Sequence, residues 1–145
     1  QAFCWKYYRA NDSKTDVDMR WPTADEMRSM TWQHLAAGAN GLMYYMLEAI
    51  LEPKRAGSEA VQKQKWNELL NITSEVKAYE EVLLSDTGSP VGRLPEGLVA
   101  RTWKLKDGSE RLLVCNATRK PVGGEMEVGG RTFAVQLPAL GVLFK

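Results

Sequence analysis

Few residues in this chain have the chemistry to bind a metal ion or act as a strong nucleophile. The candidates are Cys4, Cys115 and His34, which is the only histidine. Neither cysteine lies in a Cys-x-x-Cys pair, and a structural zinc site needs about four nitrogen or sulfur ligands. We therefore expect no metal site. Two buried free thiols in β-segments are the expected state, with a disulfide between them as the alternative.

The composition and net charge of the chain indicate which classes of binding partner to expect. The chain has 145 residues, of which 44% are apolar and 26% charged, and its formal net charge is +1. This balance is typical of an ordinary globular protein and gives no electrostatic footprint for DNA, RNA or an anionic membrane. No apolar run approaches the roughly 18 residues of a membrane span. The sequence thus predicts no nucleic-acid partner and no membrane partner.

A capped amphipathic helix is predicted after Pro22. Thr23 with Glu26 three residues later is the capping-box pattern, and Gly38 stands where helices usually end. The apolar positions recur at spacings of three and four: Met27, Met30, Thr31, His34 and Leu35. Because His34 falls on this stripe, we expect it to be a neutral core histidine with one hydrogen bond.

Two β-segments flank this helix. Residues 2–8 (AFCWKYY) are aromatic and β-prone. Residues 41–50 (GLMYYMLEAI) are apolar at both odd and even positions, as in a strand buried on both faces. Strand, helix and strand in this order make a βαβ unit, which requires a parallel sheet. A second helix is predicted from Ser58 to about Leu84. One face of it carries Trp66, Leu69, Leu70, Thr73, Val76 and Leu83.

The second half of the chain changes character. Glycine and proline cluster in residues 86–97, which we interpret as a linker. Residues 98–145 then hold five or six short β-prone segments, with an Asp107-Gly108 turn between the first two. Such spacing favours a small antiparallel sandwich or barrel.

The motifs of both halves resemble one family. PT-x-x-E-M-R-x-M-T (22–31), A-x-G-A-x-G-L-x-Y-Y (36–45) and QAFCW (1–5) are similar to the closing βα units of bacterial (β/α)8-barrel glycoside hydrolases. Leu-Pro-x-Leu-Gly-Val (137–142) is similar to the final strand of the β-domain that often closes such enzymes. The resemblance implies a fold of class α/β plus all-β. Residues 1–85 would be a partial TIM-barrel βαβα segment, and residues 98–145 a β-sandwich.

The same resemblance implies a function. The chain would be the C-terminal part of an enzyme that hydrolyses O-glycosidic bonds by acid–base chemistry, with a carbohydrate substrate, no cofactor and a secreted or periplasmic location. The first predicted strand lacks the glutamate that many relatives carry at its end. Either the acid and nucleophile lie on earlier strands or the protein does not hydrolyse sugars, and in both cases the fragment alone would be inactive. The alternatives are a non-catalytic carbohydrate-binding module and a structural module that forms a homodimer through exposed strand edges.

Candidate site residues follow from the barrel resemblance, because barrel active sites lie at the carboxyl ends of the strands. Glu48 is the catalytic candidate, although a solvated loop charge is the favoured alternative for it and for Asp12, Asp16 and Asp18. Arg9 and Arg20 could contact a carboxylate or hydroxyl groups. The candidates for packing on a sugar face are Trp5, Tyr7, Trp21, Tyr44 and Tyr45, with ordinary core packing as their alternative.

Overall fold

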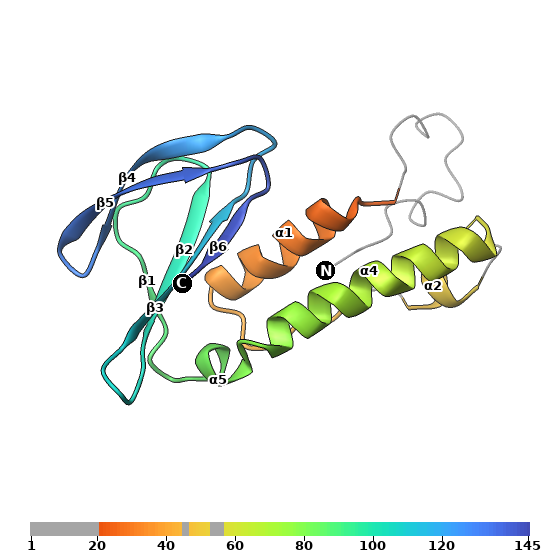
Figure 1. Ribbon diagram of the computed structural model, residues 1–145, viewed down its shortest axis with the longest axis horizontal. Coiled ribbons are helices and arrows are strands. Elements are labelled where there is room, and N and C mark those ends of the chain that lie inside the picture. Colours follow the sequence, from red (N-terminus) through yellow and green to blue (C-terminus); the bar gives the residue numbers. More distant parts are fainter. Residues whose placement is uncertain (1–20, 45–46, 53–56) are drawn as a thin grey trace.

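The computed structural model describes residues 21–44, 47–52 and 57–145 (Figure 1). The predicted strand at 2–8, the loop that follows it and Cys4 lie outside these residues. The helices are α1 (Ala24–Ala36), α2 (Glu48–Leu51), α4 (Glu59–Lys77) and α5 (Glu80–Leu83). The strands are β1 (Ser89–Pro90), β2 (Leu98–Lys104), β3 (Glu110–Asn116), β4 (Val122–Val128), β5 (Arg131–Leu137) and β6 (Val142–Phe144). The fold is therefore mixed α/β, with helices first and antiparallel sheets second.

Helix α1 begins and ends where the sequence predicts. The Thr23 hydroxyl accepts a hydrogen bond from the Glu26 backbone N–H at 3.2 Å, and the Glu26 carboxylate accepts one from the Thr23 N–H at 2.9 Å. Gly38, just beyond the helix, adopts a φ of 101°, which glycine tolerates best. Both halves of the predicted capping box are thus present.

The prediction that His34 is a core residue is wrong. Its side chain is exposed, and its Nδ1 donates to the Met30 carbonyl at 2.6 Å. The largest fully buried side chain of this helix is Trp32. The helix is rotated so that Trp32 and Ala36 join Met27 and Leu35 on the buried side, which turns His34 toward solvent.

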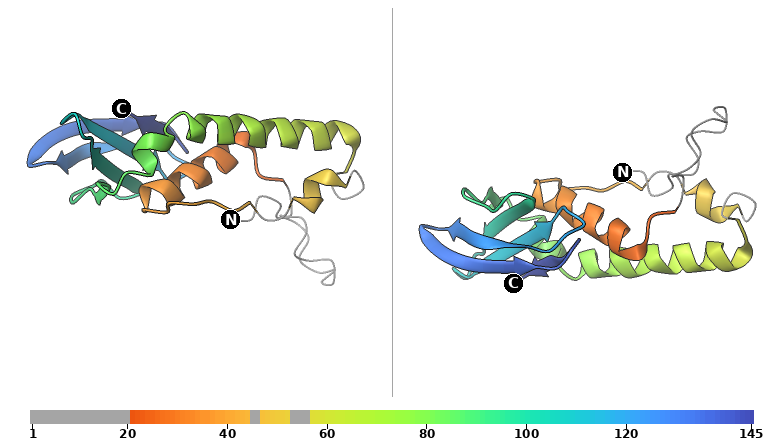
Figure 2. Two further views of the ribbon diagram at one scale, coloured as in Figure 1. Left: turned by 90° about the horizontal axis from the view of Figure 1, so that it is seen from below. Right: turned by 90° about the horizontal axis from the view of Figure 1, so that it is seen from above.

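The predicted strand over residues 41–50 is also wrong in its extent. Residues 41–44 are extended chain without strand assignment, and α2 already begins at Glu48. Figure 2 shows the chain after α1 running back along α1 and α4 toward α2.

The second helix begins at its predicted cap but is broken near its end. Ser58 accepts a hydrogen bond from the Val61 N–H, and α4 ends at Lys77 instead of running on to Leu84. The break lets the ring of Tyr79 pack on Trp32 and Phe144, with ring centroids 5.7 Å and 4.2 Å away. The buried side chains of α4 are Lys65, Leu69 and Ile72, whereas Trp66 and Leu70, predicted on that face, are exposed.

The β-strands match their predictions closely and form two antiparallel sheets. One sheet has the order β1-β2-β3-β6, and the other is the β4-β5 hairpin. Strand β1 falls in the predicted linker, where Ser89 pairs with Thr102 of β2. The Asp107-Gly108 turn joins β2 to β3 as expected, with a φ of 81° at Gly108.

Side chains of β2 and β3 pack into two separate cores, one on each face of the sheet. One set packs against the β4-β5 hairpin, in a cluster of Leu98, Ala100, Val114, Met126, Val135 and Leu137. The other set packs against α1, in a cluster of Trp103, Leu113, Cys115, Trp32, Leu35 and Ala36. Trp103 therefore lies at the junction between the sheet and α1. The larger sheet is covered on one face by a hairpin and on the other by α1 (Figure 1).

Cys115 is a free thiol inside this junction. It is fully buried, and this burial raises the pKa of its thiol to about 12. A thiol with so high a pKa stays protonated and unreactive at neutral pH. The prediction of a buried free cysteine is confirmed for Cys115.

Asn116 ties together two turns of the β-region. Its fully buried side-chain amide donates to the carbonyls of Lys120 at 2.7 Å and Pro138 at 2.8 Å. Its Oδ1 accepts hydrogen bonds from the backbone N–H and the hydroxyl of Thr118, both at 2.8 Å. One side chain thus holds the β3–β4 turn against the β5–β6 turn.

Replacing Asn116 should therefore be costly. We expect Asn116→Leu to lower the free energy of unfolding by about 2–3 kcal/mol, because buried backbone groups lose their partners. Urea unfolding followed by circular dichroism measures the change, with Asn67→Leu at an exposed position of α4 as the control. A loss no larger than that of the control would contradict this role.

Candidate functional site

Two of the predicted aromatic site residues meet in one cluster. Trp21 and Tyr44 both pack against a core of Met27, Ile50, Leu69 and Ile72. This core joins α1, α4 and the segment between them, so the two rings come together from distant parts of the chain. Packing of this kind matches the alternative given for these residues, and sugar binding by them stays a prediction.

The hydroxyl of Tyr44 has a defined hydrogen bond. It lies 2.7 Å from the hydroxyl of Thr31, which in turn donates to the Met27 carbonyl at 2.9 Å. Since a hydroxyl has only one hydrogen, Tyr44 is the donor to Thr31. Burial raises the pKa of Tyr44, and the hydrogen bond with Thr31 opposes that shift. The ring is thereby anchored on α1 as a neutral phenol.

The other candidates cannot be placed. Glu48 is the first residue of α2, but its side chain lies outside the described part of the structure. Outside it altogether are Trp5, Tyr7, Arg9, Asp12, Asp16, Asp18, Arg20 and Tyr45. Their proposed roles in catalysis and binding stay predictions.

Two open cavities lie along α4, and together we call them the α4 groove. The larger, about 520 Å³, is bordered by Leu42 and Tyr44 on one side and by Val76, Lys77, Glu80 and Leu84 on the other. The smaller, about 250 Å³, is lined by Ile50, Leu51, Gln62, Lys63 and Trp66. Most of these side chains are apolar, with a few charged groups among them.

The groove has little of the chemistry of an active site. Glu80 is the single carboxylate among the described residues that line either cavity. No group of three or more potential metal ligands occurs in the described part of the chain. Among those same residues, no helix is both long and apolar enough to cross a bilayer. The lining suits packing against another apolar surface better than it suits proton transfer.

A charged pair fixes α4 against α1. Nε and Nη2 of Arg28 donate to the two carboxylate oxygens of Glu75 at 2.7 Å and 2.5 Å. The hydrogen bond from Arg28 lowers the pKa of Glu75, and burial opposes the shift. The indole nitrogen of Trp32 is buried and also lowers the pKa of Glu75.

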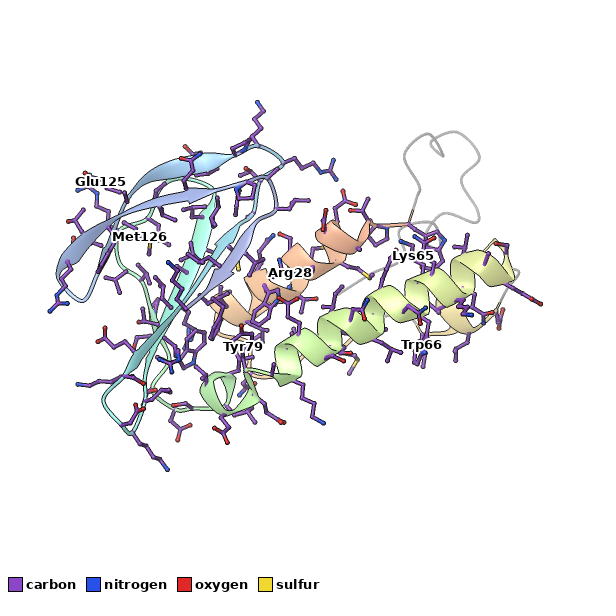
Figure 3. All side chains as sticks on the ribbon, viewed as in Figure 1. Arg28, Lys65, Trp66, Tyr79, Glu125 and Met126 are labelled. Carbon is purple, nitrogen blue, oxygen red and sulfur yellow. The ribbon has the colours of Figure 1, made fainter. Side chains whose placement is uncertain are left out.

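Two further contacts hold the start of α1. The buried Lys65 ammonium donates to the Pro22 carbonyl at 2.9 Å and to the Glu68 carboxylate at 2.7 Å. Arg119, from the β3–β4 turn, donates to the Glu26 carboxylate at 2.9 Å. Figure 3 shows Lys65 and Trp66 on opposite sides of α4, with Lys65 on the side of α1. The helix pair is thus fixed on one side and open on the other.

Sequence reasoning missed the exposed residues of this open side. Trp66 and Leu70 stand four residues apart and so share a face of α4, but it differs from the face of Leu69 and Ile72. The sequence itself shows this second face, because Trp66 and Leu70 fall on a different side of the helix from Leu69 and Ile72. The prediction treated these two apolar faces of the helix as one.

Comparisons with protein-family models, with curated proteins and with solved structures find no match for this chain.

The Arg28–Glu75 pair predicts a pH dependence of stability. Because the pKa of Glu75 lies below its ordinary 4.5 in the folded state, the pair stabilises above pH 4.5, and this is lost as the pH falls through the lowered pKa. Both side chains are about one-third exposed, so we expect Glu75→Gln to cost only about 0.5–1 kcal/mol at neutral pH.

Urea titrations at neutral and acidic pH measure this difference. It should shrink on acidification and in high salt, whereas Glu125→Gln, at an exposed position of β4, should show no such loss. A Glu75→Gln effect that is the same at both pH values would show that the pair is not its cause.

Proposed function

We propose that this chain is the closing section of a (β/α)8-barrel glycoside hydrolase. The segment 41–44 belongs to its last barrel strand, and α1 and α4 are the helices before and after that strand. The two antiparallel sheets form a sandwich-like accessory domain that covers the outer surface of α1. The activity of the whole enzyme is acid–base cleavage of a glycosidic bond.

The side-chain pattern of residues 41–44 carries this proposal. Leu42 packs against the Trp32 cluster and Tyr44 against the Met27 cluster, whereas Met43 between them is 79% exposed. Alternation with a period of two is the pattern of a strand. One face of this segment is covered by helices, and the other presents a large apolar side chain. In a barrel that second face points inward and is filled by side chains from other strands.

The order of elements supports the same arrangement. α1 precedes the segment and α4 follows it, and both pack on its same side through Met27, Leu69 and Ile72. This is the sequence helix–strand–helix of a βα repeat. The motifs at 22–31 and 36–45, which resemble the closing units of such barrels, fall on α1 and on this segment.

The proposal reassigns the candidate residues. Tyr44 faces the helices and therefore away from a barrel interior, so we assign it to packing, and Trp21 with it. Glu48 lies four residues after Tyr44, toward the end of a barrel strand at which such enzymes hold their reacting groups. We assign to Glu48 one carboxylate of the site, with the second supplied by another strand.

The rival functions have less support. A carbohydrate-binding module would carry a row of exposed aromatics, but Phe133 is the one large exposed hydrophobic residue among the described residues of the sheets. A dimerising module would use the apolar surface around Met43, Leu47 and Leu51. Light scattering over a range of concentrations separates that rival, because its mass would double.

Activity of the protein expressed from its complete reading frame tests the proposal. We expect hydrolysis of at least one member of a panel of aryl hexosides and pentosides. Glu48→Gln should lower kcat by about 10²-fold or more, because the variant loses a proton-transferring or nucleophilic group. Glu52→Gln, four residues on, is the matched control and should stay near the native rate.

The outcomes separate the two parts of the proposal. No hydrolysis of any panel member would overturn the glycoside hydrolase assignment. Hydrolysis with native kcat in Glu48→Gln would overturn only the assignment of Glu48.

A further inference from the structure

Asn40 and Gly41 form the single asparagine–glycine pair of the chain. The side-chain amide of an asparagine is open to attack by the backbone nitrogen of the next residue, and glycine hinders this attack least because it has no Cβ. The residues that follow the other asparagines all carry side chains: Asp12, Glu68, Ile72 and Ala117. Steric hindrance to this reaction is therefore lowest at Asn40.

The structure leaves both reacting groups of this pair free. Asn40 and Gly41 are exposed and lie in the loop after α1 (Figure 1). Within residues 21–44, 47–52 and 57–145, no hydrogen bond engages the Asn40 amide or the Gly41 N–H. A Cβ added to Gly41 would meet no atom within 4 Å, so the space around its nitrogen is open. Nothing in the described structure opposes the rotation that brings this nitrogen to Cγ of Asn40.

The other described asparagines are restrained. Asn67 and Asn71 lie inside α4, where the backbone N–H groups are committed to the helix. The Asn116 side chain is fully buried, and both its amide nitrogen and its Oδ1 are engaged in hydrogen bonds. At these three positions, hydrogen bonds have to break before a side chain reaches the next backbone nitrogen.

The Asp107-Gly108 pair has the same spacing in a restrained form. Ser109 donates its backbone N–H and its hydroxyl to Oδ1 of Asp107, at 2.9 Å and 2.6 Å. The Gly108 N–H donates to the Leu105 carbonyl at 2.9 Å. The hydrogen bonds from Ser109 lower the pKa of Asp107, so its side chain is a carboxylate, which is a weaker electrophile than an amide. The turn thus engages both the nitrogen and the carboxyl group that would have to react.

We infer that Asn40 is a site of spontaneous deamidation in the folded protein. The Gly41 nitrogen attacks Cγ of Asn40, and the new N–Cγ bond closes a succinimide ring. The Cγ–Nδ2 bond breaks, and ammonia leaves with the proton of the Gly41 nitrogen. Water then adds to either carbonyl of the ring and opens it to aspartate or isoaspartate at position 40. This inference goes beyond the proposed function and does not depend on it.

The reaction changes the charge of the chain and, in part of the product, its main chain. A carboxylate replaces a neutral amide, which makes the product more acidic and separable by ion exchange. Isoaspartate also places an extra carbon in the main chain between Ala36 and Leu42, which pack in the same core. The connection from α1 to the segment 41–44 therefore lengthens in the isoaspartyl product.

Ageing of the protein expressed from its complete reading frame tests this site. Samples held at neutral pH, native or unfolded in urea, are separated by ion exchange, and peptide mapping by mass spectrometry locates aspartate and isoaspartate. We expect Asn40 to convert in the native protein within a few-fold of its rate in urea. Asp107 is the internal comparison, and its isomerisation should be many-fold slower in the native protein than in urea.

Two glycine variants test the role of the attacking nitrogen. Gly41→Ala adds a Cβ that meets no neighbouring atom, and Gly41 lies outside the left-handed region, so we expect the fold to persist. Its Cβ hinders the nitrogen, and the rate at Asn40 should fall several-fold. Gly92→Ala, at another position where a Cβ meets nothing within 4 Å, is the matched control and should leave this rate unchanged.

The opposite results each overturn a defined claim. If Asn40 stays intact in the native protein while it reacts in urea, the fold restrains the pair and the inference is wrong. An unchanged rate in Gly41→Ala would exclude attack by the Gly41 nitrogen. Isomerisation of Asp107 as fast in the native protein as in urea would show that hydrogen bonding does not set which pair reacts.

Discussion

The arrangement of the described residues depends on the burial of α1 on two sides. Trp32, Leu35 and Ala36 pack into the core shared with β2 and β3, and Met27 packs into the core shared with α4. The Trp32 ring is fully buried and contacts Tyr79 and Phe144, so it joins the helical half to the β half. One helix therefore sets the position of α4, of the segment 41–44 and of the larger sheet.

This packing covers only one side of α4. The Arg28–Glu75 pair and the Lys65–Pro22 contact fix α4 on the side of α1, but the opposite side of α4 presents Trp66 and Leu70 to solvent. The segment 41–44 is likewise covered only where Leu42 and Tyr44 point. Exposed apolar surface of this kind is unfavourable in water.

Sequence reasoning succeeded where the signal is local. The Thr23–Glu26 capping box, the Ser58 cap, the Asp107-Gly108 turn and the positions of β2 to β5 each depend on residues a few positions apart. Sequence reasoning failed where a structural feature depends on packing against residues far away in the sequence. The rotation of α1 that exposes His34 and the break that directs Tyr79 to Trp32 are set by packing against a sheet formed much later in the chain.

The candidate site shows the same limit. The meeting of Trp21 and Tyr44 around Ile50 and Leu69 joins segments that no short motif connects. The exposed linker strand β1 exists only because β2 offers it an edge. The face that each side chain presents came only from the packed structure.

The central claim is that residues 41–44 form an interior strand of a parallel sheet. Amide hydrogen–deuterium exchange of the protein expressed from its complete reading frame measures this directly. The account predicts that the amides of Leu42 to Tyr44 exchange as slowly as those of Leu113 and Val114 in the paired strand β3. Exchange as fast as that of the exposed Gly129-Gly130 turn would contradict it.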